Sequence, residues 1–121
     1  MKILKSFSLV IALSFFLISC GGDSISLVQN GSFDSCEGIT VGEMVNDYFA
    51  DPSWEAIVAD DDRTYVNVTG GITFAEEPAT ALLQFKIRDD QFMVNALEIN
   101  GEGMEEFVIL LMIEDMCSEA F

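Results

Sequence analysis

Residues 80–88, Thr-Ala-Leu-Leu-Gln-Phe-Lys-Ile-Arg, carry the clearest strand pattern in the chain. Ala81, Leu83, Phe85 and Ile87 recur at every second position. Successive side chains of a strand point to opposite faces, so these four residues share one face. Gln84, Lys86 and Arg88 lie on the other. The pattern predicts a strand with one face on a hydrophobic core.

Similar period-two segments lie on both sides of this strand. They are residues 54–59, 65–69 with an extension over 72–74, and 92–99, whose alternation slips near Ala96-Leu97. Gly70-Gly71 predicts a bulge or bend within the second segment. The connections between the segments are short and turn-like: residues 60–63, 76–78 and 89–90. Short connections between successive strands favour an antiparallel meander of four strands.

Helical patterns flank the strands. Thr40 and Glu43 match a capping box, in which each side chain satisfies a backbone amide at the start of a helix. An apolar stripe at helical spacing follows (Val41, Met44, Val45, Tyr48, Phe49), and Asp51-Pro52 ends the helix. The pattern of residues 104–117 predicts a last helix. Its apolar run over residues 107–113 indicates that this helix is buried. We therefore expect an α+β domain with an N-terminal helix, a four-stranded antiparallel meander and a C-terminal helix, with both helices on one face of the sheet.

The first twenty residues have the features of a leader. Lys2 and Lys5 precede an apolar run over residues 7–17, and the segment closes with Leu17-Ile18-Ser19-Cys20. This junction resembles the lipobox of bacterial lipoproteins. The resemblance implies that residues 1–19 form a signal peptide and that Cys20 becomes the acylated first residue of the mature protein. Gly21 after it resembles the outer-membrane sorting pattern of enteric bacteria. The implied location is the cell envelope, at the outer membrane and facing the periplasm. An ordinary secretory peptide or a single membrane helix is the alternative, but a membrane helix needs about 20 apolar residues.

After this leader, residues 20–35 are rich in Gly, Ser, Asn and Asp, and we expect a flexible tether there. Residues 36–121 then form a single domain with a modest core.

The chain is strongly acidic, with a formal net charge of −16 and no histidine. Loss of Lys2 and Lys5 with the leader would leave three basic residues against 21 acidic ones, a formal charge of −18. Such a surface repels nucleic acid and anionic lipid and attracts cationic partners, so no nucleic-acid partner is expected. The interpretation we favour is that the charge only keeps the domain soluble and off the membrane.

With Cys20 used for the lipid, Cys36 and Cys117 remain as a pair in an oxidising compartment, which predicts a structural disulfide. A two-cysteine metal site would need further ligands such as histidine or a second cysteine pair. A redox-active pair is normally close in sequence, as in C-x-x-C.

A second resemblance covers about residues 38–117. Thr40-Val41-Gly42, Trp54-Glu55-Ala56, the 60–63 turn, Tyr65-Val66-Asn67-Val68 with Gly70, and Leu82-Leu83-Gln84-Phe85 occur in this order. The pattern is similar to a small α+β domain of envelope-anchored bacterial proteins, found as lipoproteins or behind a membrane-tethered zinc ribbon. The resemblance implies a fold and a location but no activity. The zinc-ribbon cysteines are missing from this chain.

The sequence offers few parts for catalysis. Without histidine, neither a Ser-His-Asp nor a Cys-His arrangement can be built. Asp60-Asp61-Asp62 suggests a calcium loop, but the positions that need glycine and glutamate hold Tyr65 and Gly71, which favours a solvated turn. We therefore expect no enzyme, no cofactor and no metal site, and the sequence identifies no binding residues.

Two functions follow as hypotheses. The first is a lipid-anchored, non-catalytic binding or scaffold module of the envelope, which holds a protein partner with its sheet face or a strand edge. The second is an inhibitor of a cationic hydrolase such as lysozyme, since the negative charge would steer a basic enzyme into contact. Known periplasmic lysozyme inhibitors resemble this chain in size, acidity and disulfide use, but their short Ser-Gly-x-x-Ala-x-Tyr signature is absent.

Overall fold

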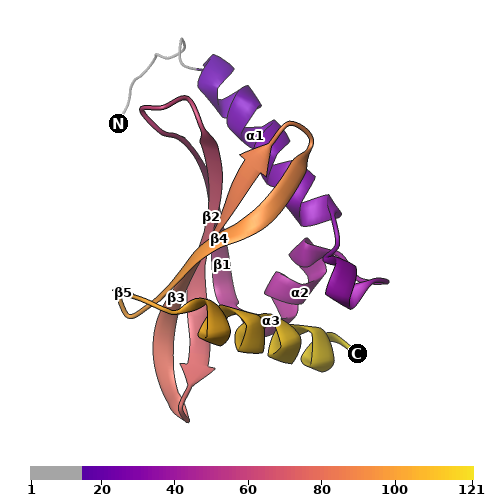
Figure 1. The fold of residues 1–121 in the computed structure, drawn as a ribbon, viewed down its shortest axis with the longest axis vertical. Helices are drawn as coiled ribbons and strands as arrows, with labels where there is room; N and C mark the ends of the chain where they lie inside the picture. The colour runs from indigo at the N-terminus through magenta and orange to yellow at the C-terminus, as the bar shows by residue number, and fades with distance from the viewer. Residues whose placement is uncertain (1–14) are drawn as a thin grey trace, which may run out of the picture.

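The structure, a computed structural model, describes residues 15–121 and has an α+β fold with three α-helices and a five-stranded antiparallel sheet (Figure 1). The helices are α1 (Phe15–Asn30), α2 (Val41–Tyr48) and α3 (Glu106–Ala120), with a short 3-10 helix, η1 (Asp34–Cys36), between the first two. The strands are β1 (Ala50–Val58), β2 (Thr64–Phe74), β3 (Glu77–Arg88), β4 (Gln91–Ile99) and β5 (Glu102–Gly103).

The sheet is a meander in which each strand pairs with the next one in the chain, in the order β1-β2-β3-β4-β5. Along β3, the predicted inward residues Ala81, Leu83 and Phe85 are all buried, whereas the residues between them remain partly exposed. The register places Phe85 between Val66 and Val94, and Leu83 between Val68 and Leu97. The strand pattern of residues 80–88 therefore correctly identified the core face.

All three helices contribute to one hydrophobic core on that face. Val28 of α1, Met44 of α2 and Met116 of α3 belong to the same buried cluster as the inward residues of β2, β3 and β4. The capping box of α2 is formed as predicted: the Thr40 side chain accepts from the Glu43 amide at 3.1 Å, and the Thr40 amide donates to Glu43 Oε1 at 2.9 Å. These hydrogen bonds hold the carboxylate form, so the pKa of Glu43 lies below its ordinary value.

The predicted flexible tether over residues 20–35 is wrong. Residues up to Asn30 belong to α1, and η1 begins at Asp34. Val28 is fully buried, and Ile25, one helical turn before it, packs against the same core. Within residues 23–30, the apolar stripe of α1 is short and set among small polar residues, which made the segment resemble a linker in composition.

The strand boundaries differ from the predicted ones for local reasons. β1 begins four residues before Trp54 and accommodates Asp51 (φ 51°) and Pro52 through a register shift between Ala50 and Ser53. Proline is tolerated there because β1 is an edge strand. The slip in the β4 pattern corresponds to a bulge: Gln84 pairs with Ala96 but Phe85 with Val94, which leaves Asn95 as the extra residue. The two-residue β5 was expected to be loop.

The last helix is a surface helix rather than the buried one predicted. Ile109, Met112, Ile113 and Met116 are buried, but Phe107, Leu110 and Leu111 are 66%, 61% and 48% exposed. An all-apolar run does not indicate which side of the helix faces the core, and here one side remains in water. The exposed side becomes important for the candidate site.

Candidate functional site

The lipidation site predicted from the sequence lies at the margin of the described chain. Residues 1–14, most of the predicted signal peptide, lie outside the described residues. Cys20 falls within α1, and the structure describes the course of its backbone but not its side chain. Within residues 15–121, none of the helices combines the length and the apolar character needed to cross a bilayer.

Cys36 and Cys117 lie together, as the cysteine count predicts. Their sulfur atoms are 2.06 Å apart, the distance of a disulfide bond, and their Cα atoms are 5.9 Å apart. The bond joins η1 to the last turns of α3 across 81 residues of sequence. It therefore fixes the segment that follows α1 against the C-terminal helix.

The acidic turn after β1 contains an ion pair. Arg63 folds back on it, with Nε 3.3 Å from Asp61 Oδ2 and its amide 3.1 Å from Asp61 Oδ1. Both side chains of this ion pair are more than half exposed. In the described part of the chain, no group of three or more His, Cys, Asp or Glu residues is arranged to hold a metal ion.

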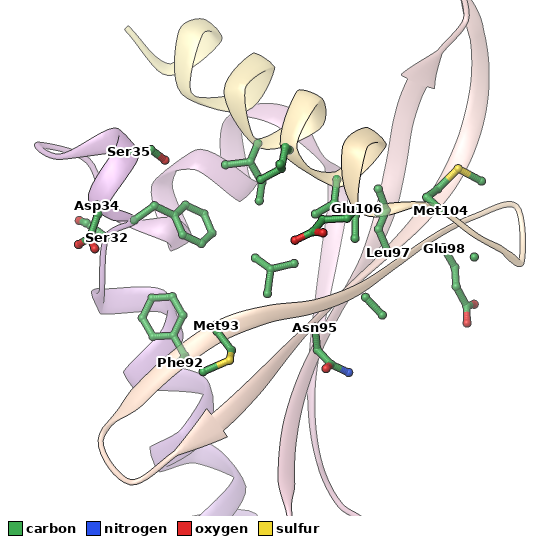
Figure 2. Close-up of a pocket in the computed structure, with 17 residues that line it drawn as sticks. Ser32, Asp34, Ser35, Phe92, Met93, Asn95, Leu97, Glu98, Met104 and Glu106 are labelled. Carbon is green, nitrogen blue, oxygen red and sulfur yellow. The ribbon is translucent and has the colours of Figure 1, made fainter.

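A hollow lies between α3, strand β4 and the segment that precedes α2. Its volume is about 650 Å³, within the range typical of ligand sites. Three segments far apart in the sequence line it: residues 32–35, residues 92–98 and the first half of α3 (Figure 2). We call it the β4–α3 groove. Its apolar lining includes Phe33, Phe92, Val94, Leu97, Met104, Ile109, Leu110 and Ile113.

A smaller hollow of about 370 Å³ continues the groove along α3. The two share Ser35, Leu110 and Ile113, and the second ends at Cys117 and Ser118. The groove therefore runs from Gly103 of β5 to the disulfide. Apolar side chains that line a hollow of this size are typical of binding sites.

One wall of the groove is a strand edge. β5 pairs only with Glu98 and Ile99 of β4, and the Met104 amide adds one hydrogen bond to the Leu97 carbonyl at 2.8 Å. Between residues 91 and 96, β4 makes no backbone hydrogen bond on the side away from β3 within the described chain. An unpaired edge of this kind offers a row of amide and carbonyl groups to another chain.

The charged residues of the groove are all acidic. Asp34, Glu98 and Glu106 line it, and no lysine or arginine is among its described lining residues. The Glu106 carboxylate is directed into the hollow, and Asp34 lies at the opposite end, beside Ser32 (Figure 2). The arrangement could bind an elongated apolar segment with positive charge at its ends.

The outer sheet face, the other surface suggested by the sequence, is less suited to docking. Its central row is polar: Asn67 pairs in register with Gln84, and the Asn95 amide donates to Gln84 Oε1 at 2.6 Å. Asn67 Oδ1 is buried without a hydrogen-bond partner in the described structure.

A third hollow, also of about 370 Å³, lies on another side of α3. Tyr48, Ile72, Phe74 and Asp115 are among its lining residues. The Tyr48 hydroxyl donates to Asp115 Oδ2 at 2.7 Å. Partial burial and the neighbouring Asp115 carboxylate raise the pKa of Tyr48 well above its ordinary value. This tyrosine therefore stays protonated and acts as a link between helices rather than as an acid or base.

Sequence reasoning identified neither the groove nor its lining. The one local signal was the excess of apolar residues in 107–113, more than a single buried helix face can use. The other two walls come from residues about 60 positions apart in the chain, near Phe33 and Phe92. Comparison of the chain with protein-family models, with curated proteins and with solved structures gave no match.

Proposed function

We propose that the protein is a lipid-anchored binding module of the bacterial cell envelope that holds a protein partner in the β4–α3 groove and performs no catalysis. The observation that carries the binding role is the groove itself: an apolar hollow of about 650 Å³ beside an unpaired strand edge. The lipid anchor is inferred from the leader and from Cys20.

The exposed side of α3 supports a binding role over a purely structural one. Phe107, Leu110 and Leu111 expose apolar surface to water. Covering that surface would be favourable by about 25 cal/mol for every Å² removed from water. A partner seated in the groove would cover Leu110 and part of this surface. The chain offers few residues suited to catalysis. It has no histidine, and its acidic groups are spread over exposed positions.

The helical course of α1 gives the anchor a geometric consequence. A helix rises 1.5 Å per residue, so residues 20–30 span about 15 Å. Because the C-terminal part of α1 packs on the core, the domain would sit at a defined distance from the lipid rather than on a flexible tether. In Figure 1 the N-terminal end of α1 lies at the β1–β2 hairpin end of the molecule. This end would face the membrane.

The lipid anchor is tested by Cys20→Ser. Acylation requires the thiol, so the variant should lose both incorporation of a labelled fatty acid and membrane fractionation. A Cys36→Ser variant serves as the control, because it lacks a different cysteine and should still be labelled. Label on the Cys20→Ser protein would refute the anchor.

The binding role is tested by a pair of surface substitutions. Leu110→Asp places a charge in the groove at a 61% exposed position, and Val58→Asp makes the same change at a 66% exposed position on β1. Both variants should fold, with unchanged melting temperatures. Affinity capture from envelope extracts should lose a specific partner with Leu110→Asp only. Equal capture by both variants would exclude the groove as the binding site.

Inhibition of a cationic hydrolase such as lysozyme is the second candidate. The exclusively acidic charge of the groove favours it, because a basic enzyme loop would find complementary charge there. In a turbidity assay with lysozyme and bacterial cell walls, inhibition that Leu110→Asp abolishes would favour this function. Unchanged lysis at a large excess of the protein would exclude it.

A further inference from the structure

Strand β4 has one edge paired along its length and one edge open. On the paired side, the residues from Arg88 back to Ala81 on β3 face Gln91 through Ile99. On the other side, only the last three residues of β4 have backbone partners, in β5 and at Met104. The six residues from Gln91 to Ala96 therefore present an edge about 20 Å long at 3.3–3.4 Å per residue.

The opposite edge of the sheet is protected, and this contrast is informative. β1 carries Pro52, which has no amide hydrogen, and its register is interrupted between Ala50 and Ser53. Proline is a common means of blocking an edge strand, because it removes a donor from the hydrogen-bond ladder. β4 has a bulge at Asn95. Phe92 and Val94 before the bulge, and Ala96 and Leu97 after it, keep their partners on β3. Its open edge has no proline.

The helix layer extends beyond β4, so a further strand would have something to pack on. α3 contacts mainly α2 and touches the sheet at β4. Ile109 and Ile113 lie at the floor of the groove and are buried, while Leu110 at its side is exposed. A strand added beside β4 would direct every second side chain toward this apolar lining.

The charge of the groove selects the kind of chain that would fit. Asp34 lies near one end of the groove, and Glu98 and Glu106 lie near the other. Glu102 and Glu105 are exposed nearby on the β5 side, and Glu114 lines the continuation of the groove. A second copy of this protein would bring the same carboxylates into contact with one another, which disfavours self-association through this edge. A segment with basic residues at its ends would be attracted.

We infer that the open edge of β4 binds an extended, basic segment of another protein as an additional strand, with alternate apolar side chains in the β4–α3 groove. This inference rests on the proposed function and specifies its partner class. Backbone hydrogen bonds to residues 91–96 supply the alignment, the apolar side chains occupy the hollow, and the terminal cations face the acidic residues. The mode of binding is β-strand addition.

A designed peptide tests the strand pairing. The probe has the sequence Lys-Thr-Val-Thr-Val-Thr-Lys, which places two valines and both terminal lysines on the same face of a strand. It is added to the full-length protein in detergent micelles, and amide hydrogen exchange is followed residue by residue. Protection of amides on the open edge within residues 91–96, with no change in β1, is the expected result.

Two altered peptides separate the contributions. Methylation of alternate backbone nitrogens removes the donors on one edge of the peptide but keeps every side chain. Loss of about three hydrogen bonds should weaken binding at least tenfold. Methylation of the other alternate set leaves the paired edge intact and is the matched control. Replacement of both lysines by glutamate should weaken binding by about fivefold or more, with the difference shrinking as salt is raised.

The outcomes distinguish this inference from the proposed function. Binding that both methylated peptides retain, or protection confined to α3, would mean that the groove holds its partner without strand addition. Failure of the lysine peptide to bind at millimolar concentration, or equal binding of the glutamate peptide, would overturn the inference as well. In each of these cases, Leu110-dependent capture of a partner would still support the proposed function. Loss of that dependence would refute both.

Discussion

The Tyr48 hydroxyl at the end of α2 donates a hydrogen bond to Asp115 of α3, with an oxygen–oxygen distance of 2.7 Å. The two residues are 67 positions apart. This is a side-chain hydrogen bond between the two helices whose packing sets the position of the α3 wall of the groove. Removal of the hydroxyl should therefore loosen α3 without disturbing the sheet.

We expect Tyr48→Phe to lower the free energy of unfolding by about 1 kcal/mol, because the bond is to a charged acceptor but both partners are partly exposed to water. Urea denaturation measures the change. Tyr65→Phe removes the only other tyrosine hydroxyl in the chain, which makes no side-chain hydrogen bond in the described structure, and is the control. Equal effects of the two substitutions would mean that the Tyr48–Asp115 bond contributes nothing measurable.

The same pair predicts a dependence on alkaline pH. The pKa of Tyr48 is raised above its ordinary value of 10.0 in the folded protein. Above pH 10 the unfolded state releases this proton more readily than the folded state, so stability is full below pH 10 and falls as the pH rises further. Unfolding measured between pH 8 and 11 should show a smaller alkaline loss in Tyr48→Phe than in the wild type. Parallel curves for the two proteins would contradict the linkage.

The disulfide predicts a large effect of reduction. In the chain-entropy model, a bond that closes a loop across 81 residues contributes about 4–5 kcal/mol. A domain of this size is typically stable by about 5–15 kcal/mol. We expect reduction to shift the urea midpoint sharply downward, and a Cys36→Ser/Cys117→Ser double variant to start low and not respond to reductant. Mass mapping of non-reduced peptides should recover the 36–117 cross-link. Free, alkylatable thiols at both positions in protein from the envelope would show that the pairing is wrong.

Substitutions of two glycines, Gly70 and Gly103, test how closely the end of α2 approaches the sheet. A Cβ atom at Gly70 would lie 2.9 Å from the Ala50 carbonyl oxygen and 2.9 Å from the Phe49 ring. The backbone oxygen cannot easily move, so Gly70→Ala should destabilise the protein by about 1–3 kcal/mol. Gly103→Ala is the control, since nothing lies within 4 Å of its added Cβ. Thermal unfolding compares the two, and similar melting temperatures would contradict the close approach at Gly70.

The sequence predicted those features that depend on residues close together in the chain. The capping box needs only Thr40 and Glu43, and the core face of β3 follows from the alternation of Ala81, Leu83 and Phe85. The meander follows from short turns. Residues 23–30 of α1 were mistaken for a tether because Ile25 and Val28 alone join the core within that stretch, and their burial depends on β-strands that come later in the chain.

The groove could not be predicted for the same physical reason. Phe33, Phe92 and Ile109 contribute to one lining only after the sheet has formed and the disulfide region has placed the segment after α1 near α3. An apolar run such as 107–113 gives the amount of apolar surface but not its direction. Which residues of α3 remain exposed depends on α2 and β4, and not on the helix itself.

Trp54 is the only tryptophan in the chain, and its replacement distinguishes a role in the core from a role in binding. Trp54 lies in the middle of β1, opposite Val68, and its ring stacks on Phe85 with 6.5 Å between centroids and 16° between planes. Truncation of a buried aromatic residue costs about 3–5 kcal/mol, and the partial exposure of Trp54 places it near the lower value. We expect Trp54→Ala to lower stability by about 3 kcal/mol, whereas Trp54→Phe should retain most of the stacking and of the stability.

Because tryptophan is also frequent in binding hot spots, capture of the partner is measured alongside unfolding. An unchanged urea midpoint with lost capture would move the binding site from the β4–α3 groove to β1.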